Sequence, residues 1–471
     1  MPPRVASALP WLLIPVGAAA AWLMIGAGFA NYDTAYALVW GSDLAQGRLP
    51  DYGVPVAPTP HPLTNLLGLL LSPLGTGAET AWVWLAFLFL GALMAVTYAL
   101  AAHWFGAVAG VIAAVIVITR EPILSYGVRA YLDIPYIVLA LAALLVEAKR
   151  PRAGLPVLLL LALAGLLRPE AWLFSFAYLA WLALGRDRGG RELAGLALVA
   201  GAAPVIWMLS DLLVTGDALH SLTGTQSNAE VLQRVTGLDD VPITAPRRLG
   251  EILREPVLLG AALGGLLSLK LMRPRVTLPA LAGAVAMVAF SVLAAAGLPI
   301  LGRYLMGPAV LLAIFCAGCL TGWSLLARDS PWRRRWQAAA AVTAVALVVF
   351  APAQVRRLDR LSASMNRQEA IRDDLFALTE DPAFAAGCEP VGVPNHRLVP
   401  LLALWLETPP SEIVSAQLRR LESGQYVEPA TERVERVFTL DPNDPGELKA
   451  GVPRGFSEVA RNGSWVLHER C

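Results

Sequence analysis

Apolar segments long enough to cross a membrane recur along the first three quarters of the sequence, separated by short polar loops. Taking roughly 17–25 apolar residues as one transmembrane helix, the pattern predicts about eleven spans. They cover residues 11–30, 79–102, 104–120, 131–148, 153–168, 170–185, 193–214, 256–272, 277–297, 303–327 and 336–354. A further apolar stretch, residues 62–73, is too short to cross and is typical of an interfacial or re-entrant helix. The pattern predicts a mainly α, polytopic helical bundle.

The pattern changes after residue 354. A charged helical segment, VRRLDRLSASMNRQEAIRDDLFALTE, is followed by short strand-like pieces with turn signals such as RNG. Half of all Asp and Glu residues lie in this last quarter of the chain. We expect a transmembrane domain over residues 1–354, including a polar loop at 31–78, and a small α/β or α+β domain over residues 355–471.

Composition agrees with a membrane protein and excludes several classes of soluble enzyme. The chain is 56% hydrophobic and only 15% charged, whereas an average soluble domain is about 25% charged. No metal-binding spacing, phosphate loop, dinucleotide fingerprint or serine-nucleophile elbow is found in the sequence. Candidate chemistry is therefore sought among the ionisable residues at the ends of spans, where burial is costly unless the charge is paired or functional.

The basic loops predict the orientation of the chain. EAKRPR, GRDRGGR, LKLMRPR and ARDSPWRRRW follow alternate predicted spans and fall on one side, which the positive-inside rule makes cytoplasmic. The first apolar segment is longer than a signal-peptide core and is interpreted as a retained span. We therefore expect a multi-pass plasma-membrane protein with a cytoplasmic N-terminus and an extracytoplasmic C-terminal domain.

Two of the four cysteines, Cys388 and Cys471, bracket the polar C-terminal part. They are either two unpaired thiols or one disulfide, and topology decides between these alternatives. Because the predicted orientation places this part outside the cell, where disulfides persist, we expect a Cys388–Cys471 bridge.

Asp33 follows the first span directly, in NYDTAYALVW. One interpretation is a helix N-cap, since aspartate is favoured at that position. The other is a functional carboxylate at membrane depth on the outer side. From the residues alone, both interpretations stay open.

Further charged residues fall at the outer ends of later spans. Arg129 and Asp133 in RAYLDIPYIV are four residues apart, so a helix carrying both would place them on one face. Singly, such residues are surface ion pairs or interfacial arginines. Together they favour an anionic ligand at the membrane surface. The other members of this group are Arg168 and Glu170 in LLRPEAWL, and Arg303 with Tyr304 in LGRYLMGP.

These segments resemble motifs of the GT-C superfamily of integral membrane glycosyltransferases, which includes the protein O-mannosyltransferases and the lipid A aminoarabinose transferase. YDTAYAL after the first span is similar to the family's first acidic motif, and RAYLDIPYIVLALAALL is similar to its second. GLLRPEAWLF is similar to the basic turn between two spans, and GRYLMGPAVLLAIF to an RYLLP-like segment. Order, spacing and sidedness agree over residues 11 to about 330.

The resemblance implies an inverting hexosyl- or pentosyltransferase that moves a sugar from a polyprenyl-phosphate donor to an acceptor hydroxyl on a glycan, glycolipid or protein. It makes Asp33 the general base, with Asp133 as a second catalytic carboxylate, and it implies no nucleic-acid partner. Many members carry a pair of acids where this chain has Asp33 alone, so a divalent cation stays an open alternative. The remaining residues fall into two groups: donor-phosphate binding by Arg303, Arg129 and Arg168, and substrate contacts by His61, Tyr32, Glu170 and Tyr304.

Two other classes of protein fit the composition, a polytopic transporter and a non-catalytic assembly protein of the cell envelope. A transporter would show charges or helix breaks at mid-membrane in paired, inverted repeats. No such repeat is visible, and the acidic residues gather at one face of the predicted bundle. His61, in PTPHPL, is equally consistent with a substrate contact and with a structural loop histidine.

Overall fold

The structure is a computed structural model that describes residues 3–185, 188–441 and 451–471. The described chain divides into two compact units. Unit 1 comprises Met1–Gly26, Trp84–Ile206 and Gly237–Ser362, and unit 2 comprises Ala27–Val83, Trp207–Thr236 and Ala363–Cys471. Each unit is therefore built from three separate stretches of sequence.

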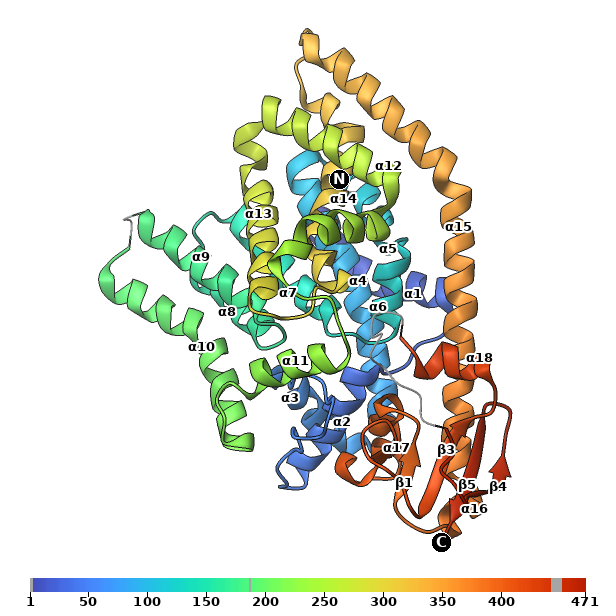
Figure 1. The fold of residues 1–471 in the computed structure, drawn as a ribbon. Helices are drawn as coiled ribbons and strands as arrows, with labels where there is room; N and C mark the ends of the chain where they lie inside the picture. The colour runs from blue at the N-terminus through green and yellow to red at the C-terminus, as the bar shows by residue number, and fades with distance from the viewer. Residues whose placement is uncertain (1–2, 186–187, 442–450) are drawn as a thin grey trace. The chain divides into compact units, whose positions relative to one another are not determined.

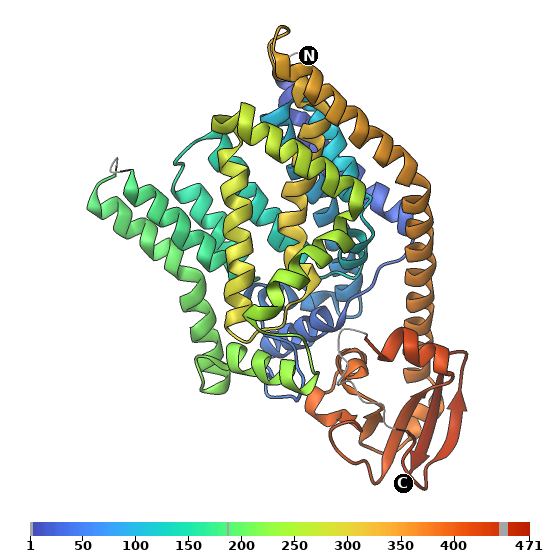
Figure 2. The same cartoon turned by 45° about the horizontal axis from the view of Figure 1, so that its top comes forward.

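Unit 1 is a bundle of apolar helices (Figures 1 and 2). Three helices, α4, α10 and α15, begin in one unit and end in the other. The helices that lie wholly or partly in unit 1 are α1 (Pro3–Ile25), α4 (Gly77–Phe105), α5 (Ala107–Ile118), α6 (Glu121–Val128), α7 (Asp133–Lys149), α8 (Leu155–Gly165), α9 (Glu170–Leu184), α10 (Gly190–Thr215), α12 (Val241–Leu271), α13 (Arg273–Ala295), α14 (Met306–Thr321) and α15 (Pro331–Thr379). Short 3-10 turns lie at Leu238–Asp240, Gly302–Leu305 and Gly322–Leu325.

Among the described residues, six helices are long and apolar enough to cross a membrane, or seven if the bent pair α5–α6 forms one span. The chain is thus a multi-pass membrane protein with a mainly α fold. Every predicted span coincides with a helix, but several of these helices are short, so the count of eleven stays a prediction. Residues 62–73 form the short helix α3 (Pro62–Leu71) and part of the turn that follows it, as their length predicts.

Helix α15 is a single helix of 49 residues (Figure 1). It passes through residue 354, where the composition of the chain changes, without a break. Pro352 lies inside the helix and does not end it. The boundary between the two units falls later, between Ser362 and Ala363. The division at residues 354 and 355 stays a prediction.

Unit 2 contains a five-stranded sheet of order β2-β1-β3-β5-β4. Strands β2, β1 and β3 are parallel, whereas β5 is antiparallel to both β3 and β4. RNG connects β4 to β5, as its turn signal predicts. The strands are β1 (Val391–Val393), β2 (Val414–Ser415), β3 (Gly424–Pro429), β4 (Ser457–Arg461) and β5 (Trp465–Arg470). The helices of unit 2 are α2 (Tyr32–Ala45), α3, α11 (His220–Val231), α16 (Pro382–Ala386), α17 (Val399–Trp405) and α18 (Glu432–Val434), with a 3-10 turn at His396–Leu398.

Within unit 2, α2 and α3 pack at backbone distance. A Cβ atom added at Gly41 would lie 2.2 Å from the carbonyl carbon of Gly68, so neither position has room for a side chain. Helix α2 also packs into a buried core that it shares with the C-terminal part of unit 2, residues 363–471, and it contributes Tyr36 and Trp40 to this core. The helix that begins at Tyr32 is thereby held firmly within this unit.

Cys388 and Cys471 form the expected disulfide, with Cα atoms 5.8 Å apart. The bridge closes a loop with a sequence separation of 83 residues. In the chain-entropy description, a loop of this size stabilises the folded state by roughly 4–5 kcal/mol. Cys316 and Cys319 are buried, free thiols.

We expect Cys388→Ser with Cys471→Ser to lower the melting temperature of the purified protein, because the unfolded C-terminal segment regains its freedom. Alkylation of the denatured wild-type protein should modify two of its four cysteines before reduction and all four afterwards, as read by intact mass. Cys316→Ala with Cys319→Ala is the matched control and should leave the bridge intact. Four modified cysteines without reduction would refute the bridge.

Candidate functional site

The turn between α6 and α7 positions two of the predicted residues of unit 1. Arg129 ends α6, and its Nε and Nη2 donate to the carbonyl and the hydroxyl of Ser125 at 3.0 and 2.6 Å. Ala130 adopts a left-handed conformation with φ 56°, which stops the helix. Asp133 then begins α7 with 1% of its surface exposed. Arg129 and Asp133 therefore do not share a helix, because the chain turns between them.

Arg168 bridges two buried carboxylates. Its Nη1 lies 2.6 Å from Asp133 Oδ1, and its Nη2 lies 2.6 Å from Glu170 Oε1. Nε also donates to Glu170 Oε1, at 3.0 Å. The three side chains are each no more than 7% exposed. The partner of Asp133 is therefore Arg168, two helices further along the chain, and a buried network of this kind is costly to break.

Tyrosine rings enclose these charges. The guanidinium carbon of Arg168 lies 3.9 Å from the ring centre of Tyr304. Tyr131 lies between two arginines, with its ring centre 5.5 Å from the guanidinium carbon of Arg129 and 5.1 Å from that of Arg303. A guanidinium over an aromatic face is stabilised electrostatically and is held in one plane. Arg129 thus joins the group through Tyr131.

Arg303 is the more accessible cation of this group. Its side chain is 17% exposed, against 7% for Arg168, and its Nε lies 3.9 Å from Asp133 Oδ2. Among the described residues, Asp133 Oδ2 and Glu170 Oε2 accept no hydrogen bond. We refer to Asp133, Arg168, Glu170 and Arg303 as the arginine–carboxylate cluster. It has two cations and two acids, and Arg303 is the arginine best able to meet a ligand.

The donor set of this cluster does not fit a divalent cation. Mg²⁺ and Ca²⁺ bind carboxylate oxygens that carry uncompensated negative charge. Here Arg168 already lies between Asp133 and Glu170, so a second cation would be repelled. One triad of described residues has metal-ligand spacing: Cys388, Glu469 and Cys471. Its two cysteines are joined in the disulfide and offer no thiolate.

In unit 2, Asp33 lies in the first turn of α2, and Asn31 is the N-cap of this helix. The side-chain oxygen of Asn31 accepts the backbone N–H groups of Asp33 and Thr34 at 2.7 and 3.2 Å. The interpretation of Asp33 as the cap is therefore corrected, since Asn31 fills that position. A carboxylate in the first turn still interacts favourably with the helix dipole.

Tyr32, next to Asp33, is held as a neutral phenol. Its hydroxyl donates to the carbonyl oxygen of Val56 at 2.9 Å, and Val56 has φ 63°, a rare conformation for a β-branched residue. Burial raises the pKa of Tyr32 well above its usual range. Tyr32 is therefore no candidate for a base near neutral pH, which leaves the carboxylate beside it.

His61 precedes α3, and its ring packs edge-on against Trp207, with ring centres 5.3 Å apart. Trp207 comes from a distant part of the sequence within the same unit. The neighbouring loop is also tied to α11, because Asn228 donates to the carbonyl of Ala57 at 2.7 Å and the hydroxyls of Thr59 and Thr225 lie 2.6 Å apart. These contacts give His61 a structural environment. Its part in substrate contact stays a prediction.

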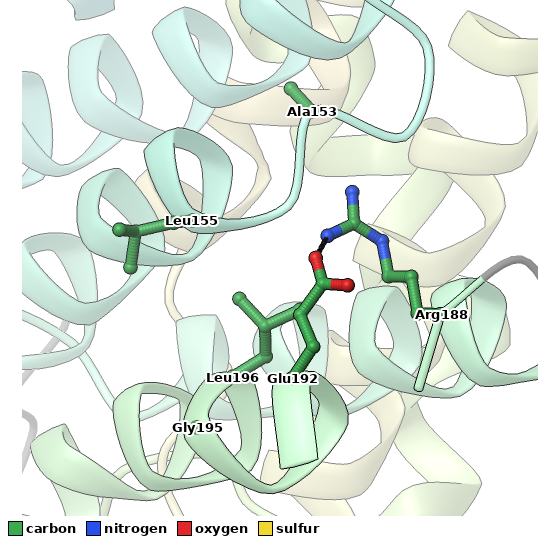
Figure 3. Close-up of a pocket in the computed structure, with 6 residues that line it drawn as sticks. All are labelled: Ala153, Leu155, Arg188, Glu192, Gly195 and Leu196. Carbon is green, nitrogen blue, oxygen red and sulfur yellow. Dashed lines mark hydrogen bonds and ion pairs between the residues drawn. The ribbon is translucent and has the colours of Figure 1, made fainter. Parts of the chain in front are cut away.

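A surface depression of about 440 Å³ lies in unit 1 (Figure 3). Arg188 and Glu192 form an ion pair across it, four residues apart. The other lining residues are Ala153, Leu155, Gly195 and Leu196. None of the predicted site residues lines this depression, so it is not the candidate site.

The two units thus hold different parts of the predicted site. Unit 1 brings together Asp133, Arg168, Glu170, Arg303 and Tyr304, and joins Arg129 to them through Tyr131. Unit 2 holds Tyr32 and Asp33 on α2, and His61 before α3. Sequence reasoning missed Tyr131 and Trp207, and also Tyr136, whose ring centre lies 5.8 Å from the guanidinium carbon of Arg168. Tyr131 lies inside the motif RAYLD, between Arg129 and Asp133. Its position between two charged residues could have identified it as a candidate site residue.

The chain shares its fold with two solved structures, so the resemblance is confirmed at the level of fold alone. The chain is similar to the crystal structure of ArnT from Cupriavidus metallidurans bound to undecaprenyl phosphate, with a TM-score of 0.54 and 14% identity over 99% of this chain and 98% of that one. It is also similar to the apo oligosaccharyltransferase from Archaeoglobus fulgidus, with a TM-score of 0.52 and 12% identity over 91% of this chain and 70% of that one. No protein-family model and no curated protein matches the sequence.

Proposed function

We propose that this protein is a membrane glycosyltransferase that moves a sugar from a polyprenyl-phosphate-linked donor to an acceptor hydroxyl. The observation that carries the proposal is the full-length likeness to ArnT bound to undecaprenyl phosphate, a lipid phosphate of the expected class. The oligosaccharyltransferase from Archaeoglobus fulgidus, tethered with an acceptor peptide, supports the same kind of reaction at a TM-score of 0.51. The sugar is a hexose or pentose, and the acceptor a glycan, glycolipid or protein.

The chemistry assigned to the residues follows from what the transfer requires. The acceptor oxygen attacks the anomeric carbon from the side opposite the phosphate, which inverts the configuration. The bond from that carbon to the phosphate oxygen breaks, and the phosphate leaves with the electron pair. The acceptor proton passes to a positioned carboxylate, the part that we give to Asp33.

Arg303 is proposed as the first ligand of the leaving phosphate. A guanidinium donates two parallel hydrogen bonds to phosphate oxygens and stabilises the charge that develops there. Its accessibility supports this choice, since the N–H groups of Arg168 are engaged by Asp133 and Glu170. Arg129 is the second candidate. Arg168 then holds Asp133 in place, and Tyr304 would contact the substrate beside it.

The reaction is proposed to occur on the outer face of the membrane, with the N-terminus inside and the sheet domain outside. Tyr32, Glu170 and His61 are proposed substrate contacts on the strength of the motif resemblance. The disulfide Cys388–Cys471 supports an oxidising location for the sheet domain.

Arg303→Ala tests the phosphate assignment. We expect the KM for the lipid donor to rise at least tenfold, while the KM for the acceptor changes less, because a charge-assisted phosphate contact is lost. Transfer of a radiolabelled sugar from defined polyprenyl-phosphate donors measures both. Arg247→Ala is the matched control, since its side chain is 73% exposed and forms its ion pair with Glu251, outside the cluster. An unchanged donor KM would remove Arg303 from the phosphate site.

A further inference from the structure

The helix that carries Asp33 packs directly on the C-terminal part of unit 2, residues 363–471, which we call the sheet domain. Helix α2 contributes Ala35, Tyr36 and Val39 to the same buried core as Leu398 and Leu402 of the sheet domain. Figure 1 shows α17 beside α2, and the two helices are in contact. The first turn of α2 therefore depends on the sheet domain for part of its packing.

The segment of the sheet domain nearest this turn follows strand β1. Asn395 caps a short 3-10 turn by accepting the backbone N–H of Arg397 at 3.1 Å, and its Nδ2 donates to the carbonyl of Thr439 at 2.9 Å. Strand β1 lies between the parallel strands β2 and β3. After β1 the chain forms β2 on one side of it and then β3 on the other side, so the strand order reverses at β1. In open parallel sheets, the loops at such a reversal of strand order are the usual place for functional groups.

His396, the next residue, touches Tyr32. The two rings meet edge to face, with centres 5.4 Å apart and planes at 85°. His396 is only 3% exposed, and its Nδ1 lies 3.1 Å from Gln417 Oε1, so the ring has a fixed plane. Tyr32 is held on its other end by Val56. Tyr32, the residue adjacent to Asp33, is thus held in place by Val56 of the loop at residues 31–78 and by His396 of the sheet domain.

Arg397 brings a positive charge to the same place. Its guanidinium is 19% exposed and lies 3.3 Å from Asp441. Its charge lowers the pKa of Tyr32 while that of Asp33 raises it, although burial has the larger, raising effect on this pKa. Arg397 and Asp33 are therefore both within electrostatic reach of one phenol.

We propose that the segment Asn395–Arg397 of the sheet domain is a positioning element of the Asp33 site. His396 fixes Tyr32, and through it the first turn of α2, so that the carboxylate of Asp33 is held where the acceptor proton must be taken. The sheet domain is then a necessary part of the catalytic centre. This inference rests on the proposed function of Asp33 as the base.

The test compares His396→Ala with His396→Phe in the full-length protein. Loss of the ring in the alanine variant should lower kcat at least tenfold with little change in the donor KM, because a displaced base affects the chemical step and spares donor binding. Phenylalanine restores an aromatic edge against Tyr32 and should recover most of kcat. Arg419→Ala, on an exposed residue of the same domain, is the control.

Each outcome decides one point. A wild-type kcat in His396→Ala, with Asp33→Asn inactive, overturns the positioning role and leaves the proposed function standing. Activity in Asp33→Asn overturns the proposed base itself. If His396→Ala loses its disulfide or melts early, His396→Phe decides, since a stable phenylalanine variant with the alanine variant's kcat also overturns the inference.

Discussion

Asp33→Asn is expected to abolish sugar transfer while leaving the protein folded. A positioned general base contributes about 10²–10⁴-fold to rate, and asparagine cannot accept the acceptor proton. The helix should survive, because its cap is the Asn31 side chain, which the substitution leaves in place. Initial rates with a labelled polyprenyl-phosphate sugar, alongside the melting temperature, measure the two effects separately.

Asp43→Asn is the matched control for this substitution. Asp43 lies on the same helix and is equally an aspartate, but it pairs with Arg48 at 2.7 Å near the other end of α2. The control should keep its transfer rate within a few-fold of the wild-type protein. A wild-type rate in Asp33→Asn would show that this carboxylate is not the base. Equal losses in both variants would point to damage to the helix instead.

Much of the fold was predictable because its determinants are local. Apolar runs of membrane length become helices wherever they occur, and the shorter run at 62–73 becomes a shorter helix. The disulfide followed from sidedness and from two cysteines that bracket one domain. These features depend on the sequence near each element, or on one simple long-range rule.

The helix boundaries at the site were less predictable, because single residues decide them. Asn31 and Asp33 are both good caps, and only the backbone reveals that the helix begins at Tyr32, so that the cap lies two residues before the aspartate. Ala130 gives no sign in the sequence of its left-handed conformation, yet it separates Arg129 from Asp133. The two residues therefore do not lie on one helix, although a spacing of four within a helix would place them on one face.

The pairing of charges across helices was not predictable at all. Asp133 and Arg168 are 35 residues apart, and their contact depends on how α7 and the α8–α9 turn pack. The motifs placed both residues at the ends of spans. This position was enough to assign them to one candidate site, but it did not show which arginine is the better phosphate ligand. The structure distinguishes the arginines by exposure: the side chain of Arg168 is 7% exposed and that of Arg303 is 17% exposed.

Arg168→Leu is expected to destabilise the protein more than any other single change discussed. It removes the cation between Asp133 and Glu170 and leaves two buried carboxylates close together, and breaking a buried ion pair in this way costs roughly 3–5 kcal/mol. Arg303, with its Nε 3.9 Å from Asp133 Oδ2, compensates only part of that charge. Since proteins are stable by only about 5–15 kcal/mol, the folded yield should fall sharply.

The triple variant Arg168→Leu, Asp133→Asn, Glu170→Gln tests whether the stability lost in Arg168→Leu comes from uncompensated charge or from the changed shape of the side chain. Removing all three charges together should recover much of the lost stability, because no uncompensated carboxylate stays buried. Arg247→Leu, at a 73% exposed position, makes the same chemical change outside the cluster and should alter stability by less than about 0.5 kcal/mol. Melting temperature and the monodisperse fraction in detergent measure the series. If Arg168→Leu alone is as stable as the wild-type protein, Arg168 does not stabilise the fold by holding Asp133 and Glu170 together. Its role would then have to lie in the reaction itself.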